Sequence, residues 1–140
     1  PVSILDWMPT VLELTGHETY FEELPGRSLV PLIRDPALQW PERTIIADYA
    51  CDGTRVPMRM VRRGRWKAAF APGLPATLYD MERDPHEWRD LGDDASSQET
   101  LKELEAAARA DGWDPAALTD AILAHKRRLT YINASETAAE

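Results

Sequence analysis

Four short runs of strand-forming residues lie in the middle of the chain, separated by segments that contain Gly or Pro. They cover residues 44–50, 58–63, 66–70 and 77–81, and the second run alternates Met and Arg apart from Val61. Gly64 and Arg65 alone separate the second run from the third, and Gly at the first turn position favours a type II′ hairpin. The pattern predicts a four-stranded antiparallel sheet, with Trp66 and Tyr79 buried against the first helix of the chain.

Apolar residues at helical spacing predict helices before and after the sheet. The first helix spans residues 3–16, ends at Gly16, and tolerates Pro9 if Asp6 caps it and Pro9 lies in the first turn. A short helix over residues 29–34 follows Ser28 as its cap. Two further helices are expected at 97–110 and from Pro115 onward. The fold class is therefore α+β: the sheet with flanking helices, plus a two-helix C-terminal extension.

Composition and charge narrow the function classes. The chain has 140 residues, 44% of them hydrophobic, which allows a modest core. Its net charge of −8 disfavours nucleic acid as a partner, and no apolar run is long enough to span a bilayer. A single cysteine excludes an internal disulfide framework and is typical of a cytoplasmic protein. The chain begins in mid-pattern without an initiator Met, so we expect it to be part of a longer protein.

Several motifs, in this order and spacing, resemble the C-terminal part of the sulfatase family, and most closely the choline-sulfatases. They are SILDWMPT at residues 3–10, Asp48-Tyr49, Gly53-Thr54, MVRRGRWK at 60–67, LYDMERDPHE at 78–87 and Asp90-Leu91. The resemblance implies the C-terminal subdomain of the alkaline-phosphatase-like sulfatase fold at residues 1–95. It also implies a helical choline-sulfatase-like extension at 96–132, followed by a frayed tail at 133–140.

The resemblance implies a parent enzyme that hydrolyses choline sulfate to choline and sulfate with a divalent cation, Ca or Mg, and a formylglycine. The partners expected are the upstream catalytic domain of that parent, a small-molecule sulfate ester and a homo-oligomer, without nucleic acid or membrane. The chain departs from choline-sulfatases where they continue into an aromatic tail that helps to form the oligomer. Two alternatives are another sulfatase-fold hydrolase, such as an arylsulfatase or a phosphonate monoester hydrolase, and a non-catalytic interaction module.

We assign no catalytic residue and no metal ligand to this chain. Formylglycine forms in a Cys/Ser-x-Pro-x-Arg motif, whereas Cys51 is followed by Asp52 and then by Gly53 in place of the proline. The carboxylates of the 84–94 segment lack the spacing of an EF-hand and are expected to form a solvated acidic loop. The nucleophile and the metal ligands are therefore expected upstream of Pro1.

Asp48 and Tyr49 are the candidate substrate-binding residues. They end a predicted strand, from which a side chain can reach a neighbouring cleft. If the choline-sulfatase resemblance holds, the Asp48 carboxylate could face a quaternary ammonium, which aromatic faces also bind. The structural alternative is an ion pair across the sheet between Asp48 and one of Arg55, Arg59 or Arg62.

Overall fold

The computed structural model describes residues 1–17, 24–50, 54 and 56–137, with side chains up to residue 130. Cys51, Asp52, Gly53 and Arg55, named above, lie outside the described residues. The chain forms two compact units, Pro1–Ile45 and Ile46–Glu140, which are described separately.

The first unit contains the 3₁₀ helix η1 (Ile4–Asp6), α1 (Trp7–Thr15) and α2 (Val30–Arg34). Pro9 lies in the first turn of α1, and Gly16 ends that helix with a φ of 72°, as a left-handed C-cap requires. Asp6 holds the predicted N-cap position of α1, but its side chain makes no cap hydrogen bond there. Ser3 caps η1 instead, and the Asp6 side chain turns back to accept a hydrogen bond from the Ser3 amide at 2.8 Å.

The Ser28 cap is also displaced, because α2 begins one residue later than predicted. Leu29 holds the N-cap position without a side-chain cap bond. The Ser28 hydroxyl still accepts a hydrogen bond from the Val30 amide at 3.2 Å.

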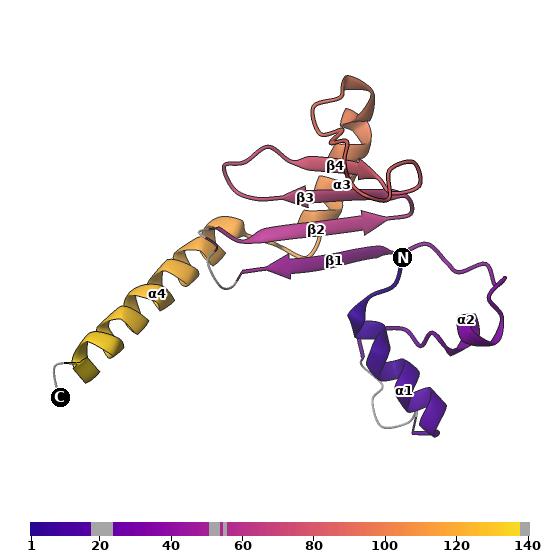
Figure 1. Ribbon diagram of the computed structural model, residues 1–140, viewed down its shortest axis with the longest axis horizontal. Helices are drawn as coiled ribbons and strands as arrows, with labels where there is room; N and C mark the ends of the chain where they lie inside the picture. Colours follow the sequence, from indigo (N-terminus) through magenta and orange to yellow (C-terminus); the bar gives the residue numbers. More distant parts are fainter. Residues whose placement is uncertain (18–23, 51–53, 55, 138–140) are drawn as a thin grey trace. The chain divides into compact units, whose positions relative to one another are not determined.

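The predicted four-stranded antiparallel sheet is present, in the order β1-β2-β3-β4 (Figure 1). Its strands are β1 (Thr44–Tyr49), β2 (Met58–Arg63), β3 (Trp66–Phe70) and β4 (Thr77–Asp80). Arg63 pairs with Trp66 across the two-residue turn, in which Gly64 has a φ of 53°. The positive φ at this first turn position fits the predicted type II′ hairpin.

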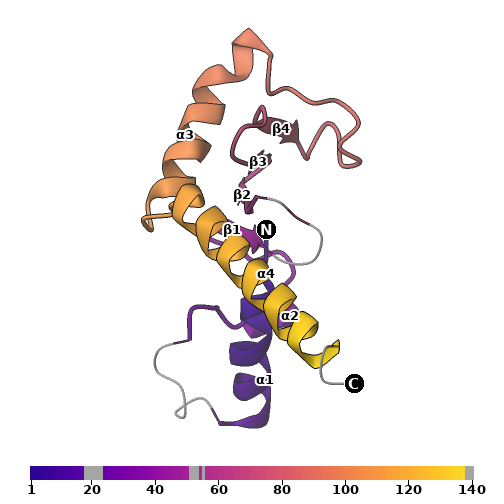
Figure 2. The ribbon, with the colours of Figure 1, turned by 90° about the vertical axis from the view of Figure 1, so that its left-hand side faces the viewer.

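The core of the second unit lies between the sheet and α3 (Gln98–Arg109), which crosses one face of the strands (Figure 2). A short 3₁₀ helix, η3 (Ala95–Ser97), leads into α3. The buried residues of this core are Val61, Ala68, Phe70, Leu78, Leu104, Ala108 and Trp113. Trp66 packs at its margin and is only half-buried, as is Tyr79, so both side chains are less buried than predicted.

The long helix α4 (Pro115–Thr137) follows α3 and begins as predicted. The Asp114 carboxylate caps it by accepting hydrogen bonds from the amides of Ala116 and Ala117, each at 3.0 Å. The helix continues past residue 132, the predicted end of the extension. The domain bounds 1–95, 96–132 and 133–140 remain predictions. Within the part of the chain that is described, no helix has the length and apolar character needed to cross a membrane.

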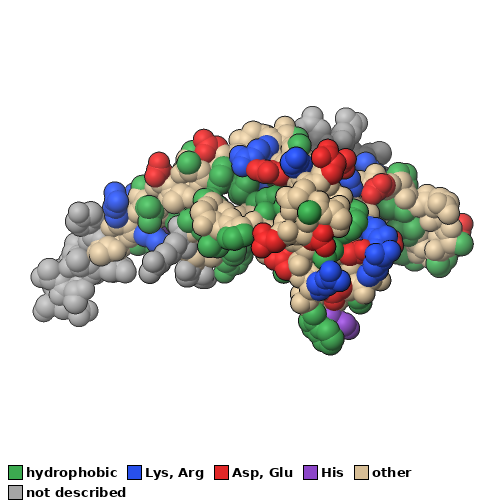
Figure 3. Space-filling model, turned by 90° about the horizontal axis from the view of Figure 1, so that it is seen from above, with side chains coloured by type: hydrophobic (Ala, Val, Ile, Leu, Met, Phe, Trp, Pro, Cys, Tyr) green, Lys and Arg blue, Asp and Glu red, His purple; other side chains and the backbone are tan. Residues whose placement is uncertain are grey.

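The sheet edge at β4 and the loop after it carry acidic and basic side chains side by side (Figure 3). Asp80 pairs with Arg65 and more loosely with Arg83, and Arg89 lies 4.0 Å from Asp94. The loop also covers part of this edge, because the Leu91 amide donates to the Leu78 carbonyl at 2.8 Å, and a covered edge does not pair with another strand.

Candidate functional site

Arg59 on β2 has a charged side chain that makes four hydrogen bonds, and it is only 5% exposed. Its Nε and Nη2 atoms donate to the two carboxylate oxygens of Asp48 on β1, each at 2.7 Å. Its Nη1 atom donates to the Ala108 carbonyl at 2.7 Å and to Asp111 at 2.6 Å. The guanidinium carbon lies 4.9 Å from the centre of the Trp113 ring. Arg59 therefore joins β1, β2 and the end of α3.

Arg59 and Asp111 both stay charged at physiological pH. The hydrogen bonds that Arg59 donates to Asp48 raise the pKa of Arg59 further above its usual range, although burial opposes them. The Arg59 hydrogen bond in turn lowers the pKa of Asp111. An arginine held in this way cannot exchange protons near neutral pH, so the cluster is suited to holding elements together.

The two predicted substrate-binding residues face different sides of the sheet. The Asp48 carboxylate turns to Arg59 on the α3 side, although its side chain is 48% exposed. Because neighbouring strand residues point to opposite faces, Tyr49 lies on the other side. Both residues nevertheless border one cavity, so a single ligand there could still reach both. Of the roles weighed for Asp48, this geometry supports the ion pair with Arg59; a substrate contact by Asp48 or Tyr49 remains a prediction.

The acidic loop after β4 uses its carboxylates to fix its own backbone. The Asp90 carboxylate accepts hydrogen bonds from the amides of Leu78 at 3.0 Å and Gly92 at 2.8 Å. Asp84 accepts from the Arg89 amide at 2.8 Å, and this bond lowers the Asp84 pKa. No three His, Cys, Asp or Glu side chains of the described residues are placed to hold a metal ion. These residues therefore do not fit the divalent cation that the resemblance implies for the parent.

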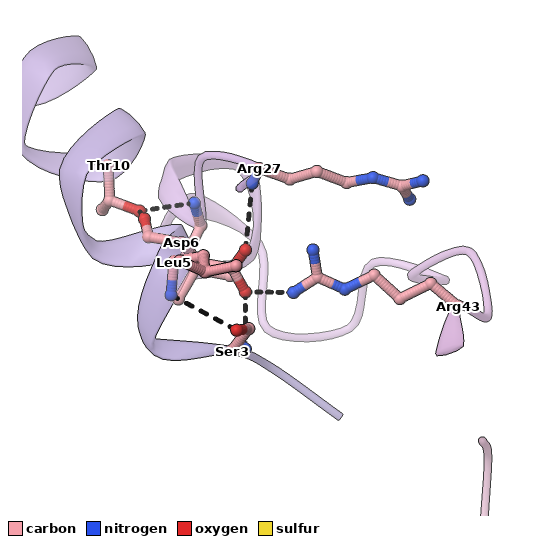
Figure 4. Close-up of polar contacts among 7 residues, drawn as sticks. Ser3, Leu5, Asp6, Thr10, Arg27 and Arg43 are labelled. Carbon is pink, nitrogen blue, oxygen red and sulfur yellow. Dashed lines mark hydrogen bonds and ion pairs between the residues drawn. The ribbon is translucent and has the colours of Figure 1, made fainter. Parts of the chain in front are cut away.

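The first unit has its own buried charge, Asp6, which is fully enclosed (Figure 4). One carboxylate oxygen accepts from the Arg27 amide at 2.9 Å; the other accepts from the Ser3 amide and pairs with the Arg43 guanidinium. Burial alone would raise the Asp6 pKa, but the bonds from Arg43, Ser3 and Arg27 outweigh it and lower the pKa to about 2. Asp6 therefore ties three separate segments of this unit together.

The sequence did not predict the hydrogen bonds that Asp6 makes with Ser3, Arg27 and Arg43. It also did not predict most of the Arg59 cluster, which consists of Arg59, Asp48, Asp111, Trp113 and the Ala108 carbonyl. It named Arg59 only as one of three partners for Asp48, and it gave Asp111 and Trp113 no role. The usable signal for Asp6 was its position three residues after Ser3, which is the spacing of a capping box. No local signal identifies Asp111, because its partner Arg59 is 52 residues away in sequence.

Comparisons with known proteins identify relatives along most of the chain. It is 32% identical over 130 residues to the choline-sulfatase of Rhizobium meliloti (strain 1021), a match that covers 87% of this chain and 24% of that enzyme. It is 31% identical over 105 residues to the Delta 4,5-hexuronate-2-O-sulfatase of Bacteroides thetaiotaomicron, covering 73% of this chain and 22% of the relative. No protein-family model matches the chain.

The fold is also similar to that of solved sulfatases. A solved 2-O GAG sulfatase superimposes with a TM-score of 0.63 and 30% identity, over 75% of this chain and 23% of that one. The chain thus spans about a quarter of the length of these relatives, and the partial coverage fits the predicted C-terminal placement. Sequence and structure together confirm the resemblance, and this chain belongs to the sulfatase family as the counterpart of one part of its longer members.

Proposed function

We propose that this chain is the C-terminal part of a choline-sulfatase-like sulfuric ester hydrolase, whose whole polypeptide converts choline sulfate to choline and sulfate. The observation that carries the proposal is the match to a choline-sulfatase along 87% of the chain. The geometry supports a structural, non-catalytic role for this chain in that enzyme, because Arg59, Asp48 and Asp111 hold β1, β2 and α3 together.

The chemistry of the parent would come from outside this chain. The upstream catalytic domain would supply the formylglycine and the divalent cation, Ca or Mg, and we place the enzyme in the cytoplasm, which the single cysteine favours. This chain would contribute the sheet, α3 and the helical extension. Asp48 is the residue proposed to influence the choice of substrate, either by meeting the quaternary ammonium or by fixing the end of β1.

A fusion enzyme tests the proposal. In the Rhizobium meliloti choline-sulfatase, the matching segment is replaced by residues 1–140 of this chain, and hydrolysis of choline sulfate is measured. We expect turnover by the fusion, and none by the isolated chain with added calcium, magnesium or manganese. The same enzyme truncated before the replaced segment is the matched control. A fusion no more active than the truncated control, or metal-dependent turnover by the isolated chain, would contradict the proposal.

A second sulfatase activity has a specific observation in its favour, namely the 31% identity to a hexuronate-2-O-sulfatase. Joining the chain to the catalytic part of that relative distinguishes the two. Higher recovery of the native activity in the hexuronate sulfatase than in the choline-sulfatase fusion would favour the second candidate.

A further inference from the structure

The sheet face opposite α3 has the composition of a buried surface. Strand alternation places a mainly apolar set of side chains there, namely Ala47, Tyr49, Met58, Met60, Ala69 and Tyr79. An antiparallel sheet with one face in water normally alternates apolar residues inward with polar residues outward. In this sheet the polar positions of the second face are only Arg62, Lys67 and Thr77 among the residues described in the second unit.

This face is also open and concave. A cavity of about 520 Å³ lies against it, lined in part by Tyr49, Met58 and Tyr79 and in part by charged residues, among them Lys67 and Glu87. Tyr49 is 44% exposed and Met58 is 39% exposed. Among the described helices of the second unit, α3 lies on the opposite side of the strands, as Figure 2 shows. Apolar residues therefore form much of the lining of a hollow on the face that α3 leaves uncovered.

The charges on this face indicate the chemistry of whatever covers it. Lys67 is already paired with Glu87, with the Lys67 amine 2.7 and 2.8 Å from the two carboxylate oxygens. Arg62 is half-buried, and its Nε atom is buried without a hydrogen-bond partner within the described part of the chain. A buried guanidinium donor without an acceptor is costly, so a suitable partner would bring a carboxylate or carbonyl oxygen to Arg62.

We infer that this face docks against the catalytic part of the same sulfatase, on an apolar surface that presents an acceptor oxygen to Arg62. The inference rests on the proposed function. Matched relatives are about four times as long as the segment that aligns with this chain, so most of each polypeptide is available to cover the face. A second copy of this chain fits less well, because a symmetric pair would bring two Arg62 side chains to a face whose Glu87 is already paired.

Methionine oxidation measures the covering of this face directly. The chain has four methionines, two of them on the face, and Met81 lies in the turn after β4. The isolated chain and the choline-sulfatase fusion described above are treated briefly with dilute peroxide, and sulfoxide is quantified by peptide mass spectrometry. We expect the oxidation rates of Met58 and Met60 to fall by about fivefold or more in the fusion, with Met81 little changed.

A substitution provides an independent readout. The double variant M58E/M60E should lower the turnover of the fusion by about tenfold, because it places two carboxylates in an apolar contact. Leu74→Glu is the matched control: Leu74 is 63% exposed in the turn between β3 and β4, and its replacement should leave turnover unchanged. Equal turnover of the double variant and the control would count against the docking face.

The outcomes separate this inference from the proposed function. An active fusion in which Met58 and Met60 react as fast as in the isolated chain would overturn the docking face and leave the function standing. Protected methionines in an inactive fusion would support the face and count against the function. Protection already present in the isolated chain would also overturn the inference; sedimentation would then assign the covering to a second copy, if the chain is dimeric, or to residues 1–45, if it is monomeric.

Discussion

Replacing Arg59 by Met tests whether the Arg59 cluster holds the second unit together. The change keeps most of the apolar stem and removes the guanidinium. The carboxylates of Asp48 and Asp111 are half-exposed and water can hydrate them, so losing their ion pairs with Arg59 costs little stability. The Ala108 carbonyl loses a buried donor, and Trp113 loses its cation–π contact. Together these two losses predict a destabilisation of about 3 kcal/mol.

Urea unfolding of the isolated chain, followed by circular dichroism, measures this loss. If the free energy of unfolding depends on urea concentration as it does in most small proteins, a loss of about 3 kcal/mol lowers the unfolding midpoint of the second unit by about 1 to 2 M urea. Arg109→Met is the matched control, because Arg109 makes only an exposed pair with Glu105 and should shift the midpoint little. Equal shifts for the two variants would refute the role assigned to Arg59.

Three further predictions concern the buried Asp6 carboxylate, one close backbone approach and the Asp48–Arg59 ion pair. The pKa of Asp6 is about 2 when folded and 3.8 in the reference state, so Asp6 should add about 2 kcal/mol of stability above pH 4 that is lost as the pH falls through 2. Acid titration of Asp6→Asn should lack this loss, whereas Asp35→Asn should keep it. Gly26→Ala should prevent stable folding of the first unit, because a Cβ there would lie 1.9 Å from the Leu5 carbonyl oxygen. Gly73→Ala is the control: its Cβ would meet no atom within 4 Å, and the substitution should cost only about 1 kcal/mol. Thermal unfolding of the two variants measures the difference. Asp48→Asn in the fusion should lower the melting temperature and reduce turnover of choline sulfate and of a neutral aryl sulfate together, if the ion pair is its main role. A selective loss with choline sulfate at unchanged stability would instead support a substrate contact.

The strands could be predicted almost to the residue because their signals are local. Gly64 and Arg65 fix the hairpin between β2 and β3, and the bounds 58–63 and 66–70 follow from the residues on either side. The contacts of Asp6 and Arg59 could not be predicted in the same way, because their partners lie far away in the sequence. Asp6 meets the Arg27 amide 21 residues away and Arg43 37 residues away, and nothing in the intervening sequence sets those distances. Choosing Arg59 among three candidate partners of Asp48 likewise required the register between β1 and β2.

The alternating Met and Arg residues of β2 show why the buried face of this strand was hard to predict. A pattern of Met and Arg suggests that the methionines face a core and the arginines face water. In the structure Arg59 lies on the buried side under α3, where Asp48, Asp111 and the Ala108 carbonyl accept its hydrogen bonds. Met58 and Met60 consequently lie on the other face. The inversion leaves a hydrogen-bonded arginine on one side of the sheet and the partly exposed Met58 and Met60 on the other, and a further apolar surface that covered these methionines would stabilise the sheet.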